Sequence, residues 1–178
     1  MQPPSNIKTE RLILRQPIYG DAKLIFEQYA CDLEVTKYLS WQPHKSIAQT
    51  NEYIDRCILA WKNKSAFPFV LIRQNDGRLI GMVEIRIDDR KADLGYVLSK
   101  SAWGRGYMPE AVKALVDWSF KQAKIYRVWA VCDIDNIAST RVMEKVGMER
   151  EGVLKKWLVH PNISSEPRDC YCYAITSI

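Results

Sequence analysis

The sequence predicts a single mixed α/β domain over residues 1–178, with an antiparallel meander first and a β-α-β arrangement later. Its length of 178 residues matches one domain of ~100–200 residues. Hydrophobic residues make up 47% of the chain, which is enough to form a core. β-rich runs alternate with helical periodicities along the chain, with no internal repeat and no low-complexity linker.

The N-terminal part predicts one strand and two helices. Arg11–Gln16 is a β-rich run, and a short helix over Asp21–Tyr29 is expected to be capped by its first residue. Ser46 and Gln49 have the spacing of a capping box. The apolar residues that follow recur at three-to-four-residue steps, so we expect a second helix that ends at about Lys62.

The middle of the chain predicts the meander. Phe67–Arg73 and Leu79–Ile87 are joined by Asn75–Gly77, whose Asp-Gly pair is a strong hairpin signal. After the polar turn Asp88–Lys91, the run Leu94–Leu98 extends the meander by one strand.

The remaining chain alternates helices and strands. Pro and Glu in a first turn favour a helix start, and Gly147 after a periodic segment predicts a helix end. The expected elements are a helix from Pro109 to about Lys124, a strand Arg127–Cys132, a helix Ser139–Val146, and strands Glu151–Val159 and Cys170–Ile175.

Composition excludes several classes of function. No apolar run approaches the ~18 residues that a membrane helix needs, and the N-terminus does not resemble a secretory signal, so we expect a cytoplasmic protein with no membrane partner. The five cysteines show no C-x-x-C spacing, and His44 and His160 lie far apart, so we expect no metal site. The net charge is +5, but the basic residues are dispersed, which argues against a nucleic-acid partner.

Two glycines before a helix outline an anion site. Gly104 and Gly106 lack a Cβ, so the backbone N–H groups around them can point inward together, and the helix start adds a partial positive charge. Arg105 offers a further charged contact. The alternative interpretation is an ordinary glycine-containing turn before a helix.

The motif W-G-x-G-Y-x-x-E-A, followed by N-x-x-S-x-R-x-x-E-K-x-G-M, resembles the GNAT superfamily of acyl-CoA N-acyltransferases. Within it, the chain is similar to the RimJ/RimL type, which acetylates protein N-termini. The T-E-R-L-I-L-R opening, L-I-G-M, D-L-G-Y and the R-D-C-Y-C-Y-A ending extend the resemblance. The resemblance implies the GNAT fold, a mixed and mostly antiparallel sheet of about seven strands, splayed in the middle, with flanking helices. It also implies acetyl-CoA as co-substrate.

The resemblance assigns roles to individual residues. Asn136 matches the asparagine that contacts the pantetheine arm, and Ser139 matches a serine proposed to protonate the leaving thiolate. Met143 stands where many relatives have a tyrosine acid, and Met108 stands where Gly or Ala is usual. The Met108 side chain can point away while its N–H stays, so we expect phosphate binding at this position to be weakened and not lost. The expected acetyl-CoA-binding residues are Tyr96, Val97, Leu98, Trp103, Gly104, Arg105, Gly106, Tyr107, Met108, Asn136, Ser139 and Arg141.

Glu84 is the leading candidate for the general base, acting directly or through water. By strand alternation it shares a face with Ile80 and Met82, an unusual place for a carboxylate. The competing interpretation is a solvent-facing residue beside Arg86, and Asp93 is a weaker rival base. A covalent route through Cys132 is a minor alternative to direct attack in a ternary complex.

For the acceptor, the resemblance points to the N-terminal α-amine of a protein or peptide, and a ribosomal protein is a candidate partner. Trp41 and His44 are the candidate substrate contacts, with packing and a solvated loop as their respective alternatives. A polyamine, aminoglycoside or amino-acid-like acceptor is the second interpretation, and a non-catalytic CoA-binding or ribosome-associated module is the third. Many relatives pair as homodimers.

Overall fold

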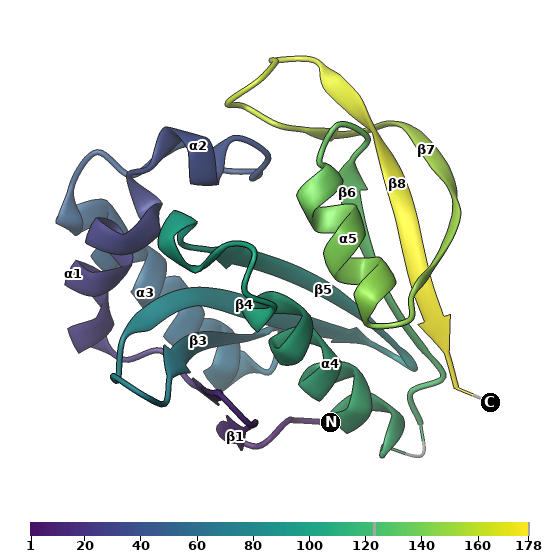
Figure 1. Ribbon diagram of the computed structural model, residues 1–178, viewed down its shortest axis with the longest axis horizontal. Coiled ribbons are helices and arrows are strands. Elements are labelled where there is room, and N and C mark those ends of the chain that lie inside the picture. The colour runs from purple at the N-terminus through teal and green to yellow at the C-terminus, as the bar shows by residue number, and fades with distance from the viewer. Residues whose placement is uncertain (123, 178) are drawn as a thin grey trace.

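The computed structural model describes residues 1–122 and 124–177, and its strands form one eight-stranded sheet (Figure 1). The strand order is β1-β2-β3-β4-β5-β6-β8-β7. The pairing is antiparallel except between β5 and β6, which run parallel. The bounds are β1 Asn6–Lys8, β2 Leu12–Arg15, β3 Phe67–Arg73, β4 Leu79–Asp88, β5 Lys91–Leu98, β6 Arg127–Asp133, β7 Glu149–Val159 and β8 Pro167–Thr176. The short β1 raises the number of strands above the expected seven.

Helices cover both faces of this sheet. In Figure 1, α4 and α5 lie in front of the sheet and α3 lies behind it. The helices are α1 Ala22–Ile25, α2 Leu33–Thr36, α3 Ile47–Asn63, α4 Tyr107–Phe120 and α5 Ile137–Lys145, with a π-helical turn at Phe26–Ala30 and 3-10 turns at Tyr19–Asp21 and Lys100–Ala102. None of the helices in the described ranges is long and apolar enough to cross a membrane.

The first helical segment differs from the expectation. Asp21 precedes α1, but its carboxylate does not cap that helix. It accepts the Ile18 N–H at 2.8 Å and pairs with Arg15 at 2.6 Å. The strong charge-assisted bonds to the β2 arginine therefore take the side chain that was expected to be the cap. By contrast, the predicted start of α3 is confirmed, because Ser46 Oγ accepts the Gln49 N–H.

Two helix bounds shift for local reasons. α4 ends at Phe120, four residues before the expected Lys124. The chain then turns, with the Gln122 N–H bonded to the Ser119 carbonyl at 3.0 Å, and buries Ile125 before β6 begins. α5 begins two residues earlier than expected, because Asn136 is its N-cap and its Oδ1 accepts the Ser139 N–H at 3.2 Å.

The predicted β3–β4 hairpin is confirmed, but it contains an irregularity. Leu71 pairs with Gly81 and the next residue, Ile72, pairs with Leu79, so one residue of β4 is left over. This bulge turns Ile80 to the face that packs with Val83, whereas Met82 packs in the cluster on the α3 side. The expectation that Glu84 shares a face with Ile80 is therefore wrong, although it shares one with Met82.

The sheet opens between its two parallel strands. Only Lys91–Asp93 of β5 pair with β6, opposite Arg127–Trp129. β6 then continues paired with β8 alone. Since the Ser99 N–H bonds to the Ile80 carbonyl at 2.8 Å, strand alternation directs the backbone of Tyr96 and Leu98 toward the opening. The expected splay is confirmed, and it leaves polar backbone groups of β5 facing a gap.

Candidate functional site

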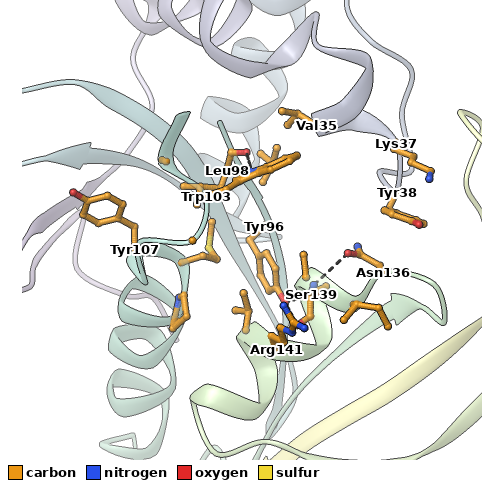
Figure 2. Close-up of a pocket in the computed structure, with 18 of the residues that line it drawn as sticks. Val35, Lys37, Tyr38, Tyr96, Leu98, Trp103, Tyr107, Asn136, Ser139 and Arg141 are labelled. Atoms are coloured by element: carbon orange, nitrogen blue, oxygen red, sulfur yellow. Dashed lines mark hydrogen bonds between the residues drawn. The ribbon is translucent and has the colours of Figure 1, made fainter. Parts of the chain in front are cut away.

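A cavity of about 700 Å³ lies at this opening. Its wall combines the end of β5, the loop before α4, the start of α5 and the α2 region, as Figure 2 shows in close-up. The residues from these elements include Val35, Tyr38, Tyr96, Leu98, Gly104, Gly106, Asn136, Ser139 and Arg141. Most of the expected acetyl-CoA-binding residues are thus brought to one place.

The loop between Trp103 and Tyr107, called here the glycine loop, has an unusual backbone. Gly104 and Gly106 have φ angles of +72° and +78°, a region that favours glycine. The Trp103 Nε1 donates to the Leu98 carbonyl at 2.8 Å and so ties the loop to β5. With these backbone angles, the N–H groups at the start of α4 remain available to bind a phosphate.

The neighbouring side chains of this loop behave differently. Met108 is 3% exposed and packs in the main core, but it also contributes to the cavity wall, so its expected orientation away from the phosphate stays a prediction. The Arg105 side chain is exposed and is not among the residues of the described cavity wall, so its contact with a phosphate stays a prediction. Tyr107 lies at the wall with its ring directed away from Ser139 (Figure 2).

Asn136, Ser139 and Tyr96 meet where β5 faces α5. The Tyr96 hydroxyl lies 2.7 Å from Ser139 Oγ and 3.2 Å from the Ser139 carbonyl oxygen, so its single proton can be donated to either oxygen. Burial raises the pKa of Tyr96, although the bond to Ser139 opposes this, so the phenol stays protonated and can donate. Sequence reasoning treated Tyr96 as a backbone contact and missed its side chain. The Tyr in D-L-G-Y, one residue after a glycine in a splayed strand, is the only local signal.

The charged residues of the wall suit a ligand that carries phosphates. The cavity wall contains three cationic side chains, from Lys37, Arg141 and Lys145, and two carboxylates, from Glu34 and Asp135. Together with the glycine loop and the largely apolar residues between them, these cations fit a long molecule with an anionic end, such as acetyl-CoA. Among the described residues, no group of three His, Cys, Asp or Glu side chains is placed to hold a metal ion.

The candidate bases lie beside this cavity and not in its described wall. Glu84 pairs across the strands with Gly95, the residue before Tyr96. Its carboxylate is bound by Arg86, which also binds Asp93. One arginine thus binds both candidate carboxylates, and the Glu84 side chain is 27% exposed, so its role as the base stays a prediction.

Cys132 lies on β6, close to Ser139, but it is a poor nucleophile. It is 6% exposed, and burial raises the pKa of its thiol to about 12, even though a bond to Ser139 opposes the shift. A thiol that stays protonated at neutral pH does not favour the covalent route.

Trp41 and His44 are not in the described cavity wall. Their ring centres lie 5.0 Å apart, and both rings pack near Tyr53. The His44 Nδ1 lies 2.8 Å from Thr50 Oγ1, and burial together with Arg56 lowers the pKa of His44. Trp41 and Tyr53 pack against the core cluster that includes Met82, and the His44 ring lies beside both, so these contacts favour packing, and a substrate role stays a prediction.

The α2 region and the residues just after it also contribute to the site. Val35 and Tyr38 reach the cavity, and the Tyr38 hydroxyl donates to the Asp135 carbonyl at 3.2 Å. Asn162, from the β7–β8 loop, donates to the carbonyl oxygens of Thr36 and Trp41 at 2.7 and 2.9 Å. These contacts join segments far apart in the chain, which local patterns do not reveal.

Comparisons with known proteins agree with this geometry. The family model described as an acetyltransferase (GNAT) domain matches residues 11–149. The uncharacterized N-acetyltransferase YnaD of Bacillus subtilis (strain 168) is 32% identical over 172 residues, with 96% of each chain covered.

Two solved structures share the fold. The microcin self-immunity acetyltransferase MccE, in complex with acetyl-CoA and AMP, has a TM-score of 0.88 at 22% identity, with 98% of both chains covered. RimL, a ribosomal α-N-protein acetyltransferase in complex with coenzyme A, has a TM-score of 0.85 at 22% identity, covering 96% of this chain and 97% of that one. With a family model that matches most of its length, this chain belongs to the GNAT family and is an N-acetyltransferase that uses acetyl-CoA.

Proposed function

We propose that this enzyme transfers the acetyl group to the N-terminal α-amine of a protein or peptide by direct attack in a ternary complex, with a ribosomal protein as a candidate acceptor. The observation that carries the proposed transfer is the Tyr96–Ser139 pair at the open end of β5, within the same cavity as the glycine loop. This pair supports the proposal because it offers a proton donor beside the position proposed for the thioester.

The donor half of the site has three tasks. The glycine loop and the start of α4 hold the diphosphate with backbone N–H groups. The backbone of Tyr96 and Leu98 holds the pantetheine arm, which extends the unpaired edge of β5. Asn136, whose side chain caps α5, lies at the cavity wall and contacts the same arm.

Ser139 and Tyr96 handle the leaving group. The amine nitrogen forms a bond to the acetyl carbonyl carbon, and the carbon–sulfur bond breaks. The thiolate takes a proton from Ser139 Oγ, and the hydrogen bond from the protonated Tyr96 stabilises the serine oxygen until Ser139 regains a proton from water. This arrangement provides an acid in a chain where Met143, fully buried on α5, replaces the tyrosine of other relatives.

The amine proton must leave on the acceptor side. Glu84 lies outside the described cavity wall and is bound by Arg86, so we propose that it receives this proton through water. An α-amine has an ordinary pKa of about 8, and a modest base is therefore sufficient.

The charges of the cavity favour a single amine over a polycation. Glu34 and Asp135 in the described wall face three cations, and Glu34 is itself bound by Lys100. A polyamine or aminoglycoside needs an excess of acidic groups, which this wall does not offer. The fold of RimL, a ribosomal α-N-protein acetyltransferase by name, also supports a protein acceptor.

The test measures CoA release from acetyl-CoA with two acceptor pools. One pool holds short peptides with free Ala, Ser or Met N-termini, each with an N-terminally blocked copy as a matched control. The other holds polyamines and aminoglycosides. Turnover with unblocked peptides alone supports the proposal. Turnover with the second pool alone transfers the assignment to small amines, and release with neither pool contradicts the proposed acceptor class.

A further inference from the structure

The T-E-R-L-I-L-R opening of the chain contacts the glycine loop from outside the cavity. Arg11 donates from Nη1 to the carbonyl oxygen of Arg105 at 2.9 Å. Its guanidinium carbon lies 4.7 Å from the centre of the Tyr107 ring, and its Nη2 lies 3.4 Å from the point where a Cβ on Gly106 would stand. Arg11 borders a separate small pocket and not the large cavity. The glycine loop therefore lies between Arg11 and the ligand-sized space.

This contact determines which way one peptide group points. In a trans peptide, the carbonyl oxygen and the following N–H point in opposite directions. The Arg105 carbonyl points to Arg11, so the N–H of Gly106 points to the opposite side, where the cavity lies. Among the described side-chain hydrogen bonds, the one from Arg11 is the bond to the Arg105 carbonyl that holds this orientation of the flexible Gly104–Gly106 backbone.

The same arginine is held in place by the first turn of α4. Glu110 Oε2 accepts from Arg11 Nε at 2.6 Å, and Glu110 Oε1 accepts from the Arg11 backbone N–H at 2.8 Å and from Thr9 Oγ1 at 2.6 Å. Burial opposes ionisation of Glu110, but the bonds from Thr9 and Arg11 outweigh it and lower the pKa of the carboxyl. We call Thr9, Arg11 and Glu110 the N-terminal clamp.

The clamp also removes an electrostatic conflict. A carboxylate in the first turn of a helix occupies the positive end of the helix dipole, where a phosphate would bind. Glu110 belongs to this turn, yet it is outside the described cavity wall because the clamp holds it on the β2 side. Arg11 thus neutralises and turns away a charge that would repel an anion.

We propose that Arg11 is a positioning residue for the donor site, which orients the Gly106 N–H and neutralises Glu110 so that the glycine loop can bind the diphosphate of acetyl-CoA. This inference rests on the proposed role of the glycine loop. It assigns to the opening motif a task in ligand binding beyond its place in β2.

The test compares ligands with and without the diphosphate. Calorimetric titration measures the Kd of CoA, dephospho-CoA and pantetheine for the wild type and for Arg11→Ala, Arg11→Lys and Arg127→Ala. Arg127 is the matched control, because it also pairs with a glutamate, Glu151, but its side chain bonds to no residue of the glycine loop among the described contacts. Pantetheine lacks the diphosphate, so its binding reports general damage to the cavity.

We expect Arg11→Ala to raise the Kd of CoA and dephospho-CoA about tenfold, the effect of a lost charge-assisted hydrogen bond. The Kd of pantetheine should stay within about twofold, and Arg127→Ala should change none of the three. Arg11→Lys, which keeps one donor, should give about threefold, and it decides the question alone if Arg11→Ala does not fold.

Two other results would overturn the proposal in different ways. An unchanged Kd of CoA, or a parallel rise for all three ligands, shows that Arg11 has no role or only a structural one. A wild type that binds CoA no more tightly than pantetheine shows that the glycine loop does not bind the diphosphate, and then the proposed donor site itself is wrong.

Discussion

The substitution Tyr96→Phe tests the proposed protonation of the leaving group. The change keeps the ring and removes only the hydroxyl, which lies 2.7 Å from Ser139 Oγ. As Ser139 gives up its proton, its oxygen gains negative charge, and a hydrogen bond to a charged group contributes about 1.5–3 kcal/mol. At about 1.4 kcal/mol for each factor of ten, kcat should fall about 10- to 150-fold. The neutral bond lost in the ground state should reduce stability by only about 1 kcal/mol.

The assay separates these effects. Steady-state CoA release at saturating acetyl-CoA gives kcat, calorimetric titration gives the affinity for acetyl-CoA, and thermal unfolding gives stability. Tyr126→Phe is the matched control, because Tyr126 is 40% exposed and lies before β6. In a double-mutant cycle, Tyr96→Phe should add little to the loss caused by Ser139→Ala. A kcat within twofold of the wild type, or additive losses, would refute the role of Tyr96.

Three further predictions follow from individual contacts. Glu84→Gln should lower kcat without changing the affinity for acetyl-CoA, since Glu84 lies outside the described cavity wall; unchanged turnover with a good substrate removes it from the mechanism. Gly81→Ala places a Cβ 2.4 Å from the Val97 carbonyl oxygen, so it should lower the free energy of unfolding by about 1–3 kcal/mol and the Tm by several degrees. Gly152→Ala is the control, because a Cβ there meets open space. Burial lowers the pKa of His44, so the unfolded state takes up a proton before the folded state does as pH falls below about 6.5. The Tm should therefore decline below that pH. An equal decline in His44→Gln would show that another group is responsible.

Local signals predicted those parts of the molecule that local physics determines. The β3–β4 hairpin depends on a turn that needs Gly77, whose φ is +68°, and the start of α3 depends on Ser46 as cap. The glycine loop belongs to the same class, because Gly104 and Gly106 adopt backbone angles that other residues avoid. The likeness of this chain to a family added the splay between β5 and β6.

The contacts that sequence reasoning missed join distant segments. The Arg11–Arg105 contact spans 94 positions and the Tyr96–Ser139 contact spans 43, and no periodicity links such pairs. The bulge opposite Leu71 likewise reverses the expected face of Ile80 without a local signal. Trp41 was a candidate substrate contact because of the resemblance, and its packing near Tyr53 is a contact that no local pattern predicts.

The most direct test of the donor site is a crystal structure of this protein with acetyl-CoA bound. The account predicts the diphosphate within hydrogen-bonding distance of the Gly104 and Gly106 N–H groups, and the thioester sulfur within reach of Ser139 Oγ, with the Tyr96 hydroxyl still on that oxygen. A diphosphate bound elsewhere, or a thioester remote from the Tyr96–Ser139 pair, would contradict it.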